Sequence, residues 1–206
     1  MNYRLSVFIL LMIFSYPALV SAADPYLGLP KRDAETSIIL NKKSISDKDM
    51  EKLKTVLCGF YNFEKIAENS LPKKTWDAMD TVSRKNYTRE LQRLIVNTTV
   101  KKYLSGIFTD FNTHKFTYEI PVFKKNGTES FINKHWIIVS TEKVLVDVTI
   151  KMDLINNNWL AYDVIEDGQS MTLNYKNQFQ AILATKKVPE LIETIKKRAD
   201  EIVLKK

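Results

Sequence analysis

The sequence of 206 residues has few of the residue types from which many functional sites are built. It contains one cysteine, Cys58, so no disulfide can form within the chain, and we expect this thiol to be buried in the core. The two histidines, His114 and His135, show no spacing with Cys or Asp that resembles a metal site. Five glycines and six prolines are too few for long flexible linkers. This length and composition suit a single domain with its own core.

Motifs of common catalytic sites are also missing. No Gly-x-Ser-x-Gly turn exposes a serine nucleophile, and no glycine-rich loop could hold a phosphate. Asp163 and the pair Glu166-Asp167 are the remaining acid–base candidates, as in cone-shaped isomerase folds, but a hydrogen-bonded structural role is favoured for Asp163. We therefore expect no enzyme, no cofactor and no metal site, and an isomerase-like enzyme that uses Asp163 as its base is the alternative.

Apolar runs are short, and the longest lies near the N-terminus. Arg4 precedes residues 7–13 (VFILLMI), and residues 20–22 (VSA) place small side chains where a signal peptidase cuts. The run is shorter than the roughly 20 residues that a membrane span needs, which disfavours the alternative of an uncleaved anchor. The sequence therefore predicts a signal peptide over residues 1–22 and a single exported, soluble domain over residues 23–206.

Basic residues outnumber acidic ones, and the formal net charge is +7. Many of them lie in pairs on predicted helices and turns: Lys42-Lys43, Lys73-Lys74, Lys101-Lys102, Lys124-Lys125, Lys186-Lys187 and Lys196-Lys197. Such scattered pairs are usually solvated, but they would also attract anionic lipid headgroups or an acidic partner surface. Because the chain carries an export signal, we expect no nucleic-acid partner.

Apolar residues recur at helical spacing in several parts of the chain. Ser46 and Asp49 form a capping box that predicts a helix start, whereas residues 23–41 contain prolines and a glycine and predict a loosely held segment. Residues 81–111 carry a continuous apolar stripe. A helix of about thirty residues would span roughly 45 Å, so we expect it to bend or break near residues 97–99, where poor helix formers meet.

Between the helices, the apolar residues alternate with a period of two. Strands are predicted over residues 116–122, 131–139 and 144–154 and from residue 158 to about residue 164, joined by short turns into an antiparallel meander. In the last strand, Tyr162 and Val164 should share one face, with Asp163 on the other. The predicted fold class is α+β, with helices, one of them long and bent, packed on a four- to five-stranded antiparallel sheet and enclosing an apolar cavity.

Several groups of residues follow one another in the order of a known family's motifs. They are Asn62-Phe63-Glu64 with Ile66-Ala67, Ser70-Leu71 with Trp76, Tyr87 with Leu91 and Leu94-Ile95, Trp159 with Tyr162-Asp163-Val164, and Gly168 with Ser170-Met171, Asn174-Tyr175 and Gln178-Phe179. Over residues 46–200 the chain resembles the MlaC-type (toluene-tolerance) family of periplasmic phospholipid-binding proteins. Pro72, Val100 and Gln169 depart from the glycine, aromatic residue and valine that are usual there.

The resemblance implies a periplasmic carrier with a phospholipid ligand. Such a carrier shuttles lipid between an outer-membrane lipoprotein/porin complex and an inner-membrane ABC lipid transporter complex, and maintains outer-membrane asymmetry; a hopanoid or another apolar lipid is the alternative cargo. Exposing the roughly thirty methylenes of a diacyl lipid to water would cost more than about 20 kcal/mol, so the lipid needs a container. The residues expected to bind it are Tyr87, Leu91, Leu94, Ile95, Tyr103, Phe116, Tyr118, Ile120, Val146, Val148, Ile150 and Tyr162.

Overall fold

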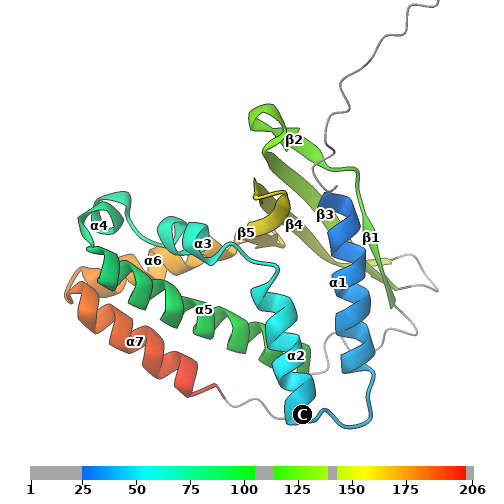
Figure 1. Cartoon of the computed structure of the whole chain (residues 1–206), viewed down its shortest axis with the longest axis horizontal. Helices are drawn as coiled ribbons and strands as arrows, with labels where there is room; N and C mark the ends of the chain where they lie inside the picture. Colours follow the sequence, from blue (N-terminus) through cyan, green and yellow to red (C-terminus); the bar gives the residue numbers. More distant parts are fainter. Residues whose placement is uncertain (1–24, 105–113, 139–142, 203–206) are drawn as a thin grey trace, which may run out of the picture.

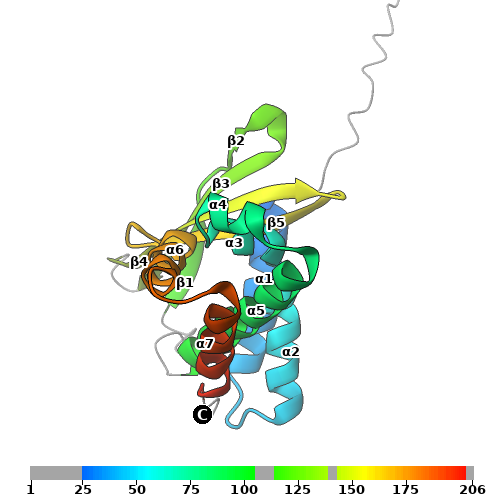
Figure 2. The same cartoon turned by 90° about the vertical axis from the view of Figure 1, so that its left-hand side faces the viewer.

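The computed structural model describes residues 25–104, 114–138 and 143–202, so the predicted signal peptide lies outside the described residues. Within these ranges the chain forms seven α-helices and one six-stranded sheet, which confirms the predicted α+β class and adds two short strands, β2 and β6. The helices gather on one side of the sheet (Figure 1), and the β2 end of the sheet projects away from them (Figure 2).

The elements follow one another as helices, then strands, then helices. The helices are α1 (Pro25–Leu40), α2 (Asp47–Cys58), α3 (Phe63–Asn69), α4 (Lys73–Ala78), α5 (Thr81–Leu104), α6 (Met171–Leu183) and α7 (Val188–Asp200). The strands are β1 (His114–Tyr118), β2 (Val122–Lys124), β3 (Glu129–Ile138), β4 (Lys143–Ile155), β5 (Asn158–Glu166) and β6 (Gln169–Ser170). Among the described residues, no helix is both long and apolar enough to cross a membrane.

Helix α2 begins where the capping box predicts. The Ser46 hydroxyl accepts a hydrogen bond from the Asp49 backbone N–H at 3.3 Å, and the Asp49 carboxylate accepts one from the Ser46 N–H at 3.1 Å. At the other end of this helix, Cys58 is exposed, so the expectation of a buried thiol is wrong. The buried face of α2 is formed by Leu53 and Leu57, and Cys58, one residue further, is turned away from that face.

Residues 25–40 form helix α1, so the prediction of a loosely held segment over residues 23–41 is wrong. Leu29, Ile39 and Leu40 are each only about 1% exposed and belong to the core. Asp33 is also buried, and it is paired with Lys134 of strand β3. These partners come from distant parts of the sequence, so local propensity, weakened by Pro30 and Gly28, does not reveal this helix.

Helix α5 runs without interruption through residues 97–99, so the break considered there does not occur. The side-chain amide of Asn97 donates a hydrogen bond to the Ala199 carbonyl on α7 at 3.1 Å, while Val96 and Val100 are buried on either side. Contacts of this kind compensate for the low helix propensity of the segment. The predicted continuation of the helix to residue 111 lies outside the described residues.

The sheet is antiparallel, with strand order β1-β3-β4-β5-β6 and with β2 paired to β3. The register places Tyr118 opposite Lys134, and Lys134 opposite Val148. It also places Ile132 opposite Ile150, and Ile150 opposite Val164. Since directly opposed residues share a face, these side chains form one surface of the sheet, which faces the helices.

An irregularity in strand β5 changes which of its residues face the helices. The β4–β5 register shifts between Lys151 and Met152, so that Met152 opposes Ala161 while Lys151 opposes Asp163. Tyr162 is the extra residue of this bulge. Ala161 and Val164, three positions apart, therefore both face inward. The prediction that Tyr162 and Val164 share one face through regular alternation is wrong.

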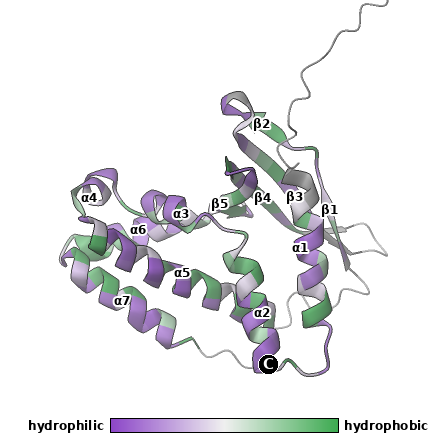
Figure 3. Cartoon of the chain, in the orientation of Figure 1, coloured by the Kyte–Doolittle hydropathy of each residue, from purple (hydrophilic) through white to green (hydrophobic). Residues whose placement is uncertain are grey.

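Apolar side chains fill three connected regions beneath the sheet. The first lies among α3, α5, α6 and α7, the second among the C-terminal end of α1, α2 and α5, and the third between α1 and the inner face of the sheet. In Figure 3, hydrophobic and hydrophilic residues alternate along α7, as expected for a helix with one buried face. The helices therefore pack mainly on one another at the α7 side, and a space remains beside the sheet.

Candidate functional site

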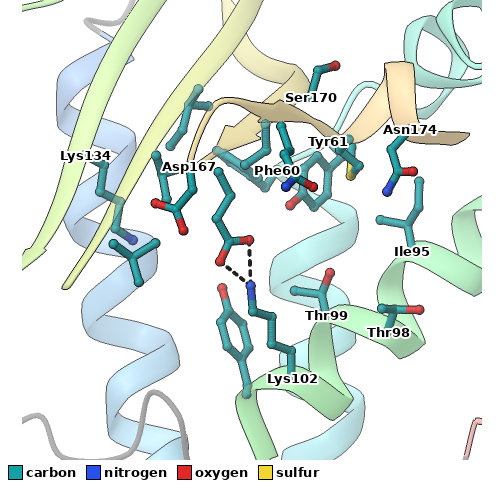
Figure 4. A pocket seen from close by; sticks show the side chains of 18 of the residues that line it. Phe60, Tyr61, Ile95, Thr98, Thr99, Lys102, Lys134, Asp167, Ser170 and Asn174 are labelled. Carbon is teal, nitrogen blue, oxygen red and sulfur yellow. Dashed lines mark hydrogen bonds and ion pairs between the residues drawn. The ribbon is translucent and has the colours of Figure 1, made fainter.

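A pocket of about 520 Å³ lies between the inner face of the sheet and helices α1, α5 and α6 (Figure 4). Ligand pockets commonly measure about 300–1,000 Å³ and are largely apolar with a few polar groups. The sheet contributes Phe116, Val146, Val148, Ile150 and Val164 to its wall. These residues come from strands β1, β4 and β5 and make this wall mainly apolar, while β3, which lies between β1 and β4, adds Lys134.

The opposite wall combines the C-terminal half of α5 with one side of α6. Helix α5 contributes Ile95, Thr98, Thr99, Lys102 and Tyr103. Burial raises the pKa of the Tyr103 hydroxyl above its usual value, so this phenol stays neutral at physiological pH. Helix α6 adds Met171, Asn174, Tyr175 and Gln178, and Figure 4 shows Asn174 beside Ile95 at the α6 end of the pocket.

Phe60 and Tyr61 enter the pocket from the link between α2 and α3. The Ala161 N–H donates to the Phe60 carbonyl at 2.9 Å, and the Asn62 N–H donates to the Ala161 carbonyl at 2.8 Å. This parallel bridge holds the backbone of the link against strand β5. Phe60 and Tyr61 were not predicted as pocket residues, although two adjacent aromatic residues just before the helix cap Asn62 could have indicated a buried site.

Charged groups interrupt this otherwise apolar wall, among them Asp167, which directly follows strand β5. Lys102 of α5 forms an ion pair with Glu166, at the end of β5, with Nζ 2.6 Å from Oε2 (Figure 4). At the α1 end, Arg32 and Lys134 line the pocket on either side of Asp33. Burial opposes ionisation of Asp33, but Lys134 and Arg32 together hold the pKa of its carboxyl below the usual value.

The structure brings half of the predicted lipid-binding residues to this pocket. The six that line it are Ile95, Tyr103, Phe116, Val146, Val148 and Ile150. Tyr87, Leu91 and Leu94 lie further along α5 and pack against the α6 and α7 side chains of the core. These residues are buried as expected, but other side chains of the protein cover them and they do not line the pocket.

The other three predicted residues lie outside the pocket wall for different reasons. Tyr118 is on the pocket face of the sheet but directs its hydroxyl to Asp33. Ile120 follows the end of strand β1, and it is 87% exposed, away from the pocket. Tyr162 is the bulged residue of β5, and it lies with its ring 5.6 Å from the Lys65 ammonium.

Asp163 lies outside the pocket wall, and both of its carboxylate oxygens are occupied. One accepts a hydrogen bond from the Ser170 hydroxyl at 2.8 Å, and the other accepts one from the Thr172 backbone N–H at 3.1 Å. Lys151 lies 3.4 Å from the same carboxylate. Ser170 is itself the N-cap of α6, so Asp163 joins β5 to the start of this helix, as the structural interpretation predicts.

The arrangement suits binding of an apolar ligand. Across the described ranges, no group of three or more His, Cys, Asp or Glu side chains could hold a metal ion. The residues that line the pocket offer an apolar surface with hydroxyl, amide, cationic and carboxylate groups around it. Such a surface accepts acyl chains and leaves the polar groups for the ends of a ligand.

Comparison with known proteins agrees with this geometry. The family model described as MlaC protein matches residues 33–197. The chain belongs to the MlaC family. The match begins inside α1 and ends inside α7, so it includes every residue that lines the pocket except Arg32, which directly precedes it. Among curated proteins, no sequence matches.

The fold is also that of a solved phospholipid-binding protein. The phospholipid-binding protein from Ralstonia solanacearum, solved in complex with a phospholipid, matches with a TM-score of 0.69 at 13% sequence identity. The match covers 87% of this chain and 99% of that chain. The two proteins thus share one fold over nearly the whole length of the Ralstonia chain, although few of their residues are identical.

Proposed function

We propose that this protein is a phospholipid carrier that holds the acyl chains of its lipid in the pocket between the sheet and helices α5 and α6. The observation that carries the proposal is an apolar pocket at this place in an MlaC fold. The similar Ralstonia protein binds a phospholipid, which supports the same class of ligand here. Removing acyl methylenes from water stabilises the complex by about 0.8 kcal/mol for each one buried.

The carrier would act in the periplasm, after export and removal of residues 1–22. It would take up or deliver lipid at an outer-membrane lipoprotein/porin complex and at an inner-membrane ABC lipid transporter complex, and so contribute to outer-membrane lipid asymmetry. Membership of the MlaC family supports this role. A hopanoid or another apolar lipid remains the alternative cargo, since the apolar sheet wall does not distinguish between acyl chains and other apolar skeletons.

Lipid extraction of the purified protein tests the proposal directly. Protein prepared without detergent from a lipid-rich host should contain about one phospholipid per chain, as measured by native mass spectrometry and by phosphorus analysis of the extract. Wholly empty protein that takes up no lipid from added vesicles would contradict the proposal. Recovery of an apolar lipid without phosphorus would favour the alternative cargo.

A pocket-filling substitution links the bound lipid to this pocket. Thr99 lies on α5 and lines the pocket (Figure 4), so Thr99→Trp places an indole ring in the space for the acyl chains. We expect this variant to lose most of its bound lipid while its melting temperature stays within about 4 °C of the wild type. Val82→Trp is the matched control, because Val82 is on the same helix and 68% exposed.

Two outcomes of this comparison would contradict the assignment of the pocket. Full lipid occupancy in Thr99→Trp would place the lipid elsewhere. Equal loss of lipid in Thr99→Trp and Val82→Trp would mean that binding responds to any bulky change on α5 and not to the pocket.

A further inference from the structure

The α1 end of the pocket has more positive than negative charge. Arg32 and Lys134 both line the pocket, and their side chains are only 12% and 10% exposed. The carboxylate that compensates them is Asp33, which lies 3.2 Å from the Arg32 guanidinium and 2.6 Å from the Lys134 ammonium. Two buried cations therefore share one anion. An excess buried charge is costly unless a further group compensates it.

Both carboxylate oxygens of Asp33 already accept hydrogen bonds from neighbouring donors. One of its oxygens accepts from Arg32, and the other accepts from both Lys134 and the Tyr118 hydroxyl. Arg32 by contrast has an unused donor, since its buried Nε finds no hydrogen-bond partner among the described residues. A buried donor without a partner costs free energy, which adds to the cost of the uncompensated charge at this end of the pocket.

Each of the two cations also lies over an aromatic ring. The Arg32 guanidinium lies 3.6 Å from the centre of the Phe60 ring, and the Lys134 ammonium lies 3.5 Å from the centre of the Phe116 ring. Burial lowers the pKa of Lys134 to about 8, although Asp33 opposes this shift, so the ammonium is still mainly charged at neutral pH. The aromatic rings thus orient the two cations at the α1 end of the pocket, and Asp33 neutralises only part of their positive charge.

We infer that the α1 end of the pocket is a binding site for an anionic group, and that Arg32 and Lys134 make the carrier selective for anionic lipids over zwitterionic or uncharged ones. The inference rests on the proposed function, because the acyl chains would lie along the apolar wall while the phosphate or carboxylate meets the two cations. Charge-assisted hydrogen bonds from Arg and Lys to such oxygens are the strongest polar contacts that this pocket can offer.

Competition among lipids that share the same chains tests the selectivity. Delipidated protein is incubated with vesicles that contain equal amounts of dioleoyl phosphatidylglycerol, dioleoyl phosphatidylcholine and dioleoylglycerol, and the bound lipid is quantified by mass spectrometry. The wild type should favour phosphatidylglycerol over dioleoylglycerol by about tenfold or more, with phosphatidylcholine between them. Equal occupancy by all three lipids would overturn the inference and leave the carrier function standing. Failure of all three to bind would contradict the carrier function itself.

Arg32→Gln is the decisive variant because it removes the uncompensated charge and keeps the pair of Asp33 with Lys134. We expect it to bind the three lipids nearly equally, with a melting temperature equal to or higher than that of the wild type. Lys31→Gln is the matched control, since Lys31 is the exposed neighbour on the same helix and its loss changes the net charge equally. A purely structural Arg32 would instead give a less stable protein with unchanged selectivity.

Inorganic phosphate separates a lipid headgroup from a free anion as the source of the negative charge. If the headgroup is the ligand, phosphate alone should show no Arg32-dependent binding by calorimetry, because it lacks the buried acyl chains. Arg32-dependent binding of phosphate without any preference among the three lipids would assign the site to a free anion and overturn the claim of lipid selectivity.

Discussion

At the scale of single residues, Asp163 determines how strand β5 is joined to helix α6. Its carboxylate accepts from the Ser170 hydroxyl and from the Thr172 backbone N–H, and it is only 3% exposed. A negative group at a helix N-terminus also interacts favourably with the helix dipole. The residue thus has a complete set of partners within the protein, as a structural group does.

We predict that Asp163→Asn lowers the free energy of unfolding by about 1–3 kcal/mol, because the amide cannot accept all of these bonds and leaves Lys151 without its carboxylate. Urea denaturation of the wild type and the variant measures this difference. Asp167→Asn is the control, because Asp167 is exposed and its positive φ of 49° is a conformation that asparagine adopts readily. Unchanged stability of Asp163→Asn together with a loss of function would support the catalytic alternative.

At the scale of elements, the start of helix α2 depends on a carboxylate that is hydrogen-bonded in the folded state. Lys42 and the backbone and hydroxyl of Ser46 all donate to Asp49, and these bonds lower its pKa from 3.8 to about 2. Because the pKa is lower in the folded state than in the unfolded chain, the stabilisation is complete above about pH 4. It is lost as the pH falls through 2.

Asp49→Asn should therefore lower the melting temperature at pH 7 by about 2–4 °C, as loss of a helix cap does in a chain of this size. The difference from the wild type should narrow steadily between pH 4 and pH 2, which melting curves followed by circular dichroism will show. Asp47→Asn, in the same first turn, provides the control. A difference that stays constant over this pH range would mean that Asp49 acts other than through its ionised carboxylate.

Elements with a strong local pattern could be predicted from the sequence, and those held by distant partners could not. The segments in which apolar residues alternate with a period of two predicted the antiparallel meander, and the capping box predicted the start of α2. Helix α1 contains Pro30 and weak periodicity, and its position depends on the pairing of Asp33 with Lys134, about a hundred residues away. The bulge at Tyr162 likewise arises from pairing between strands and leaves no mark in the alternation itself.

The candidate site shows the same limit. Periodicity identified the buried face of α5, from Tyr87 through Ile95 to Tyr103, but it could not say which partner buries each part. Helices α6 and α7 cover the first half, so that only the later turns reach the pocket. Arg32 and Lys134 were not predicted at all, since a buried cation looks like a surface residue until its partners are known.

At the scale of the whole molecule, the ion pair between Lys102 and Glu166 connects helix α5 to strand β5 at the pocket. Lys102 of α5 and Glu166 of β5 both line the pocket, and both are 39% exposed. Partly exposed pairs contribute about 1 kcal/mol or less to stability. A weak contact at this place can be broken at small cost, which suits a carrier that has to admit and release a large ligand.

Glu166→Gln should accordingly release lipid faster, by about fivefold if the pair contributes 1 kcal/mol to the closed state, while unfolding stability changes little. Transfer of a labelled phospholipid from loaded protein to acceptor vesicles measures the rate. Because salt screens partly exposed pairs, release from the wild type should also quicken as ionic strength rises, and release from the variant should respond less. Lys73→Gln, which breaks the exposed Lys73–Asp77 pair on α4, should leave the rate unchanged. Equal release rates for the wild type and Glu166→Gln would show that the pocket opens elsewhere.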